Sequence, residues 1–157
     1  MKQPIISFLQ TKLQDKTAVL GLSGGVDSAV VAALLAAAVG PERIHGYYLP
    51  SSTNAEADAA DVALLAEQLG IAYEATPIDP LVAAYEVHLG VLEPLALGNV
   101  KARIRMTMLY ARANQLGGVV VGTGNKTELQ LGYFTKYGDG GVDLLPLAHL
   151  YKTQVWE

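Results

Sequence analysis

The segment Leu20-Gly21-Leu22-Ser23-Gly24-Gly25-Val26-Asp27-Ser28 lies between an apolar stretch and an Ala-rich stretch, and it decides the predicted fold. Residues 17–22 are predicted to form a buried strand and residues 28–39 a helix. The turn between them holds two adjacent glycines, two hydroxyls and one carboxylate. Glycine lets a ligand approach the backbone closely, and a helix start offers free N–H groups to an anion. The turn therefore predicts a phosphate site, with Asp27 as an oxygen ligand for a nucleotide-bound Mg²⁺.

The spacing of this turn differs from two common nucleotide-binding motifs. It matches neither G-x-x-x-x-G-K-[ST] nor G-x-G-x-x-G. Ser-Gly-Gly-x-Asp-Ser after a strand resembles the pyrophosphate loop of the ATP pyrophosphatases, which cleave ATP to AMP and pyrophosphate. The alternative is a plain strand-to-helix turn in which Ser23 or Ser28 caps the helix.

The composition is that of a globular protein and excludes several other classes. The 157 residues are 51% apolar and 17% charged, which predicts one domain with a sizeable core. A net charge of −4 gives no general attraction to nucleic acid, and the absence of cysteine excludes disulfides and thiolate metal sites. The longest apolar run is too short to span a bilayer, and no signal-peptide pattern is present. We expect a cytoplasmic protein without nucleic-acid or membrane partners.

Strand and helix patterns alternate along the chain, which predicts an α/β fold with a doubly wound parallel sheet of Rossmann-like type. The long helical pattern after Pro94 is expected to place Ile104, Met108 and Ala111 inward. A helix is predicted at 5–13, before the first strand. After the first strand and helix, the patterns predict in order a strand at 43–49, a helix at 55–69, a strand at 71–77, a weaker helix at 79–89, a helix at 99–116 and a strand at 119–121.

Two further groups of side chains are candidate ligand contacts. Ligands in such sheets bind beyond the carboxyl ends of the strands, so Ser51, Ser52 and Thr53 lie either near the nucleotide or in a solvated turn. The histidines lie on three different elements without ligand spacing and predict no metal site. Four of the eleven basic residues fall within twelve positions, and they form either a solvated helix face or a contact surface for anions. These residues are Lys101, Arg103, Arg105 and Arg112.

A second strand end carries a similar set of residues. Residues 122–128 read Gly-Thr-Gly-Asn-Lys-Thr-Glu, leave the strand at 119–121 and enter a short helix. Mg²⁺ commonly takes one or two carboxylates and completes its shell with water and phosphate oxygens. Glu128 therefore joins Asp27 as a predicted metal ligand. The glycine-rich segment 138–141, taken alone, predicts only a loop.

Together these segments resemble the NAD synthetase family, in its ammonia-using catalytic domain. The resemblance implies one catalytic domain over residues 1–157, with the adenine-nucleotide alpha-hydrolase type of Rossmann-like fold. Family members continue past Glu157, so it also predicts that a C-terminal part is missing. The matching segments are 23–28, 49–53, 98–103, 122–128, 132–143 and 151–153.

The resemblance implies ATP-dependent amidation of deamido-NAD with ammonia. The nicotinate carboxylate attacks the α-phosphate of ATP, pyrophosphate leaves, and ammonia displaces AMP from the adenylate to give NAD. The implied cofactor is Mg²⁺, held by Asp27 and Glu128, and the implied partner is a second copy in a homodimer. The implied ATP-binding residues are Gly21, Leu22, Ser23, Gly24, Gly25, Val26, Asp27, Ser28, Thr123 and Lys152.

The resemblance also assigns the acceptor and the catalytic groups. Arg103, Lys136 and Asp143 are implied to bind deamido-NAD. The catalytic residues are expected to be Asp27, Lys152 and Asp139. Asp139 is placed near the ammonia, where a carboxylate attracts ammonium or accepts its proton.

Two alternatives stay open from the sequence. One is another ATP pyrophosphatase that adenylates a different acceptor, which deamido-NAD dependence would separate from the first hypothesis. The other is a truncated, inactive fragment that binds nucleotide, for which ATP binding without AMP release would be the sign.

Overall fold

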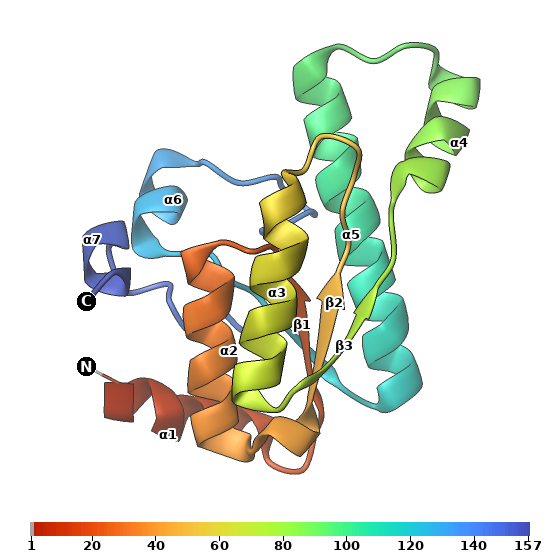
Figure 1. The fold of residues 1–157 in the computed structure, drawn as a ribbon. Coiled ribbons are helices and arrows are strands. Elements are labelled where there is room, and N and C mark those ends of the chain that lie inside the picture. Colours follow the sequence, from red (N-terminus) through yellow and green to blue (C-terminus); the bar gives the residue numbers. More distant parts are fainter. Residues whose placement is uncertain (1) are drawn as a thin grey trace.

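A parallel sheet covered by helices on both faces forms the centre of the molecule (Figure 1). The computed structural model describes residues 2–157. Within them, four strands lie in the order β3-β2-β1-β4, and every pair of neighbours is parallel. Their bounds are β1 Ala18–Leu22, β2 Ile44–Tyr48, β3 Ala72–Ala75 and β4 Val119–Val121.

The chain leaves the middle of the sheet in both directions, which confirms the predicted doubly wound fold. From β1 it runs outward through β2 to β3, and then returns to place β4 on the other side of β1. In open sheets of this kind, ligands bind where the strand order reverses, beyond the carboxyl ends of the strands. This point lies between β1 and β4.

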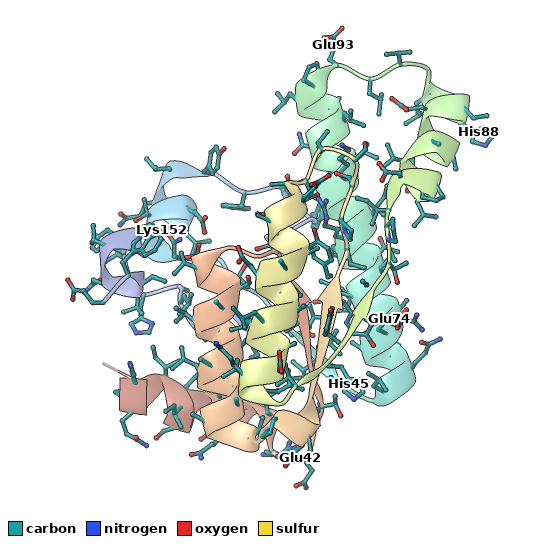
Figure 2. The ribbon with its side chains drawn as sticks, in the orientation of Figure 1. Glu42, His45, Glu74, His88, Glu93 and Lys152 are labelled. Atoms are coloured by element: carbon teal, nitrogen blue, oxygen red, sulfur yellow. The ribbon has the colours of Figure 1, made fainter. Side chains whose placement is uncertain are left out.

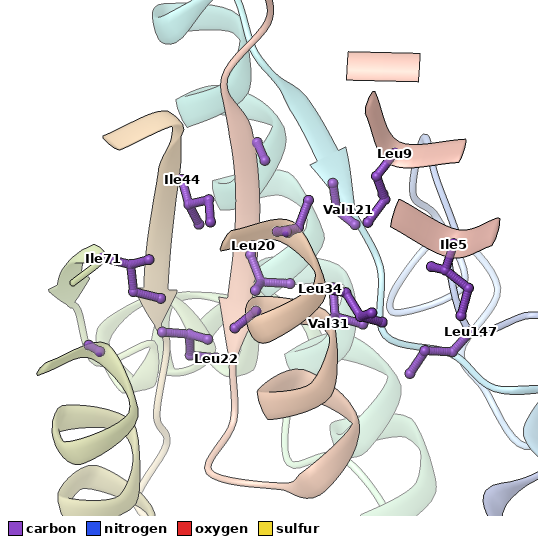
Figure 3. Packing of buried hydrophobic residues seen from close by; sticks show 14 of the residues in the cluster. Ile5, Leu9, Leu20, Leu22, Val31, Leu34, Ile44, Ile71, Val121 and Leu147 are labelled. Carbon is purple, nitrogen blue, oxygen red and sulfur yellow. The ribbon is translucent and has the colours of Figure 1, made fainter. Parts of the chain in front are cut away.

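Alternating strand residues divide the core into two layers. Leu20 and Leu22 face a cluster with α1, α2 and α3, whereas Val19 faces a second cluster with α4 and α5. Figure 3 shows Leu20, Leu22 and Val121 beside Val31 and Leu34 of α2 in the first layer. The helices are α1 Lys2–Leu13, α2 Val26–Val39, α3 Glu56–Leu69, α4 Asp79–Leu89, α5 Pro94–Leu116, α6 Lys126–Leu131, α7 Lys152–Val155 and a short 3-10 turn at Pro41–Arg43.

Helix α5 differs from its prediction at its start and on its inner face. It begins at Pro94 rather than near Asn99, because proline suits the first helical position, where no N–H donor is needed. Ile104 is buried as predicted and Met108 is half-buried, but the prediction for Ala111 is wrong because that residue is exposed. Ala113 is buried instead, where the chain turns back toward β4.

No helix within residues 2–157 is long and apolar enough to cross a membrane.

Candidate functional site

The turn after β1 presents backbone N–H groups at the carboxyl edge of the sheet. Helix α2 begins at Val26 with Gly25 as its N-cap residue, and no side chain caps it. Ser23 and Ser28 instead bond each other at 3.2 Å, and the Ser28 hydroxyl donates to the Gly25 carbonyl at 2.8 Å. The prediction that Ser23 or Ser28 caps the helix is therefore wrong. The first N–H groups of a helix have no partner within it, so this turn offers donors to an anion.

Gly24 is required in this turn by its conformation and by a close neighbour. Its φ is +82°, a value that residues with a Cβ rarely adopt. A Cβ built there would lie 3.0 Å from the Cα of Asp58 on α3. The first turn of α3 therefore packs directly against the predicted phosphate loop.

The turn after β4 is closed by side chains, unlike the turn after β1. Asn125 is fully buried and caps α6, accepting from the Glu128 N–H at 3.1 Å. The Glu128 carboxylate accepts in turn from the Asn125 N–H at 3.0 Å, which completes a capping box. Glu128 is thereby held at the carboxyl edge of the sheet.

Three predicted ATP and metal residues meet between these two turns. The Asn125 side-chain amide donates to Asp27 at 3.1 Å, which links Asp27 to the Glu128 capping box. Lys152 forms an ion pair with the other Asp27 oxygen. Its backbone N–H donates to Thr127 at 3.1 Å, so that α7 is docked on α6. In Figure 2 the label of Lys152 marks this corner, beside α6.

The donor set fits Mg²⁺. Asp27 and Glu128 provide two carboxylates, which is the usual protein contribution to a magnesium ion that also contacts substrate phosphates. Across residues 2–157, no group of three or more His, Asp or Glu side chains is arranged to hold a metal. The histidines were predicted to form no metal site. His45 on β2 and His88 on α4 are labelled well apart in Figure 2.

A cavity of about 540 Å³ opens beside the first turn. Gly21, Ser23 and Thr123 line the side that faces the two turns. Most of the remaining wall is apolar and comes from the carboxyl end of β2, from α5 and from the residues after β4. These wall residues include Tyr47, Leu49, Met106, Leu109, Val121 and Val142.

Two of the four clustered basic residues line this cavity. The Lys101 side chain is only 9% exposed, and its ammonium donates to Thr53 at 3.2 Å. Arg105 donates to the Leu49 carbonyl at 2.7 Å. Burial lowers the pKa of the Arg105 guanidinium, and the carboxylate of Asp79 opposes that shift. Within the described residues neither cation lies within ion-pair distance of a carboxylate, so both bring positive charge to the cavity.

The other two basic residues lie elsewhere. Arg112 pairs with the Glu74 carboxylate at 2.9 Å, so its charge is already neutralised on the surface. Arg103 donates to the Lys136 carbonyl at 3.2 Å, which brings together two residues predicted to bind deamido-NAD. The predicted basic cluster therefore divides into a cavity pair, a residue bonded to the Lys136 backbone and a surface ion pair.

Asp139 lies where two cavities adjoin. It lines the cavity described above and also a second one of about 390 Å³, between the start of α5 and residues 132–139. The Thr135 N–H donates to its carboxylate at 2.8 Å and fixes its orientation.

Asp143 is engaged in bonds that sequence reasoning missed. Its carboxylate accepts from the Val120 N–H and from the Tyr110 hydroxyl, each at 2.9 Å. Burial, followed by this hydrogen bond, raises the pKa of Tyr110 to about 12. Asp143 thus ties β4 to α5, and it does not line either cavity.

Comparison with known proteins identifies the family. A sequence profile described as NAD synthase matches residues 2–157. The chain belongs to the NAD synthase family. The NH(3)-dependent NAD(+) synthetase of Thermoplasma acidophilum is 49% identical over 153 residues, which are 98% of this chain and 64% of that protein. The chain therefore spans slightly less than two thirds of the length of the curated relatives it matches first.

Solved structures of similar proteins have the same fold as this chain. The NH3-dependent NAD synthetase of Campylobacter jejuni, in complex with a nitrate ion, superimposes with a TM-score of 0.94 at 34% identity, covering 99% of this chain and 69% of that one. The NMN synthetase of Francisella tularensis gives a TM-score of 0.93 at 38% identity, covering 99% and 66%.

In this NAD synthase family chain, the link through Asn125 lay outside the sequence prediction. Asn125 connects Asp27 to Glu128, and only its place three residues before Glu128 signalled a cap. For the loop after β2 the sequence left two alternatives open, and each fits part of it: Ser51 and Thr53 line the larger cavity, whereas Ser52 turns away and donates to Asp79 at 3.0 Å. The loop is thus partly a cavity wall and partly a solvated turn.

Proposed function

We propose that this chain carries the amidation site of an NAD synthetase, which uses ATP and ammonia to convert deamido-NAD into NAD. One observation carries the proposal: Asp27, Glu128 and Lys152 meet at the reversal of strand order, beside an uncapped helix start and a nucleoside-sized cavity. Membership of the NAD synthase family supports the same reaction.

In this proposal the turn 21–28 binds the ATP phosphates through backbone N–H groups and the two serine hydroxyls. Lys152 and Thr123 add a charge and a hydroxyl from the opposite side, and the apolar cavity takes the adenosine. Asp27 and Glu128 would hold Mg²⁺. When bound, Mg²⁺ neutralises charge on the phosphate oxygens and on the leaving pyrophosphate.

The reaction then needs positioning more than a protein nucleophile. A carboxylate oxygen of the nicotinate forms a bond to the α-phosphorus, the bond to the β-phosphate oxygen breaks, and pyrophosphate leaves with the electron pair. Ammonia next bonds to the acyl carbon, and the bond to AMP breaks with its electrons on AMP. The excess proton of the attacking nitrogen goes to Asp139, whose position at the junction of the cavities supports this role.

The acceptor is proposed to lie on the side of Arg103 and Lys136. Their positive charges suit the pyrophosphate of deamido-NAD, and the Arg103–Lys136 hydrogen bond keeps them together. Asp143 lines neither cavity but is exposed, so for this residue we propose contact with a part of deamido-NAD that extends beyond the cavities, through the lone pairs that Val120 and Tyr110 leave unused.

A homodimer is proposed through the apolar surface of α4 and the start of α5. This arm projects from the rest of the molecule in Figure 1, and exposed patches of this kind mark association sites. A second copy supplies a matching surface about a two-fold axis. Light scattering should give a dimer mass, reduced by Val87→Asp but not by Leu64→Glu on exposed α3. The exposed large apolar residues are Leu81, Tyr85, Val87, Leu89, Val91 and Leu95.

A second candidate acceptor comes from the NMN synthetase structure, which is 38% identical to this chain. That reaction would amidate nicotinate mononucleotide by the same chemistry. The purified chain is therefore incubated with ATP, Mg²⁺, ammonium and each acceptor, and products are detected by mass spectrometry. NAD formed from deamido-NAD in preference supports the proposal, and NMN formed in preference favours the second candidate. ATP binding without any AMP would contradict both.

A further inference from the structure

Asn125 contacts both of the carboxylates assigned to the metal. Its side-chain amide donates to one oxygen of Asp27, and its backbone N–H donates to one oxygen of Glu128. Its side-chain oxygen accepts from the Glu128 N–H. One buried residue thus fixes an oxygen on each carboxylate. The two carboxylates lie on different helices, and Asn125 is 98 positions from Asp27 in the sequence.

The helix cap alone does not explain an asparagine at this position. Serine or aspartate would cap α6 about as well by accepting the Glu128 N–H. Aspartate, however, has no N–H to donate to Asp27. The serine hydroxyl lies one bond from Cβ, whereas the asparagine amide nitrogen lies two bonds away and reaches further. Asparagine both accepts from Glu128 and donates to Asp27, so its residue type fits the link between the carboxylates.

Within the described residues, the link leaves one of the four carboxylate oxygens without any donor. The second oxygen of Asp27 pairs with Lys152, while the second oxygen of Glu128 has no hydrogen-bond donor anywhere in residues 2–157. Asn125 is fully buried, so its amide is a donor that the protein itself supplies to Asp27. Groups that orient metal ligands in this way govern affinity although they do not touch the ion.

We infer that Asn125 is a positioning residue that sets the orientation of Asp27 and Glu128 toward Mg²⁺. This inference rests on the proposed function, which supplies the Mg·ATP complex. Asn125 itself contacts neither the ion nor the reacting atoms. Its loss should therefore weaken the metal-dependent part of ATP binding and leave the metal-independent part intact.

The test measures ATP affinity by calorimetry, once with Mg²⁺ and once with EDTA, in the absence of any acceptor so that nothing turns over. The ratio of the two dissociation constants gives the contribution of the metal. Asn125→Ser and Asn125→Thr both supply a hydroxyl that caps the helix, add no charge, and lose the bond to Asp27. Asn114→Ser, at an exposed position on α5, is the matched control.

We expect the ratio to fall roughly 10- to 100-fold in both Asn125 variants and to stay unchanged in Asn114→Ser. ATP affinity in EDTA, equal to that of the unaltered chain, shows that each variant is folded. An unchanged ratio in the folded Asn125 variants would overturn the inference and leave Asn125 as a helix cap. A ratio of one in the unaltered chain would overturn the metal assignment of the proposed function, and the inference with it.

Discussion

The turns after β1 and β4 begin alike and end differently. Each leaves the carboxyl end of a strand through glycine and enters a helix, after the inner strand β1 in one case and after the edge strand β4 in the other. The turn after β1 has no side-chain cap on its helix, whereas the turn after β4 has a complete capping box. The first turn therefore offers the free N–H donors of α2. The second turn offers the Glu128 carboxylate, and the start of α6 is already capped by Asn125.

Under the proposed function, the N–H groups and helix start of the first turn would bind phosphate, while Asp27 of that turn and Glu128 of the second would bind the accompanying cation. Asn125 joins the two turns through a hydrogen bond of 3.1 Å to Asp27, which would set the two positions relative to each other. Substitutions in each turn separate these contributions, and Asp27 comes first because it belongs to the first turn and is bonded by Asn125 of the second.

Asp27→Asn should have the largest effect. The variant loses a proposed metal ligand and leaves Lys152 without its ion-pair partner. We expect Mg·ATP affinity and AMP formation to fall by more than the roughly 100-fold that residues behind metal ligands can cost. Calorimetry and AMP detection measure both, with Asp61→Asn on exposed α3 as the control. Normal Mg·ATP affinity in Asp27→Asn would contradict the proposed site.

Gly24→Ala should destabilise the first turn. A Cβ at φ +82° is strained and meets the Asp58 backbone at 3.0 Å, so unfolding should become easier by about 1–3 kcal/mol. Urea denaturation measures this change. Gly98→Ala is the control, because a Cβ there meets nothing within 4 Å and stability should hold or rise. Equal stability of the two variants would show that the α3 contact does not constrain the turn.

Glu128→Gln tests whether the second turn acts through charge or through capping. The glutamine oxygen can still accept from the Asn125 N–H, so thermal stability should change little. Loss of the negative charge should raise the Mg²⁺ concentration needed for half-maximal AMP formation by roughly tenfold. An unaltered Mg²⁺ requirement would remove Glu128 from the metal site.

Tyr110→Phe should have the smallest effect and reports on how β4 is anchored. Loss of the bond to Asp143 should cost about 0.5–1.5 kcal/mol of stability near neutral pH. Because the pKa of Tyr110 is raised from 10.0 to about 12, its contribution is present below pH 10 and disappears as the pH rises toward 12. Urea denaturation across this range should show the two proteins converging. A constant difference would contradict the bond to Asp143.

The strand-and-turn signals were strong enough to predict the fold and the corner around Asp27. Short apolar runs and the glycine turns are local features, so β1, β4 and the helices that follow them could be placed from the sequence. Asp27, Glu128 and Lys152 meet because parallel strands end at the same edge. Their roles remain proposals.

Contacts between distant segments were beyond sequence reasoning. Nothing local indicates that Asn125 reaches Asp27, or that Asp143 bonds Tyr110 and Val120. The contacts of the basic residues could not be predicted either, because helical spacing does not show that Arg112 pairs with Glu74 while Lys101 lines a cavity. Ala111 and Ala113 are chemically identical, so only tertiary packing could decide which is buried.

The most direct test of the proposed reaction follows an oxygen atom. Deamido-NAD labelled with ¹⁸O in its nicotinate carboxylate is incubated with the chain, ATP, Mg²⁺ and ammonium, and the products are analysed by mass spectrometry. Adenylation of the carboxylate transfers one labelled oxygen to AMP and none to pyrophosphate, with NAD formed in equal amount. NAD formation with unlabelled AMP, or absence of NAD altogether, would contradict the account.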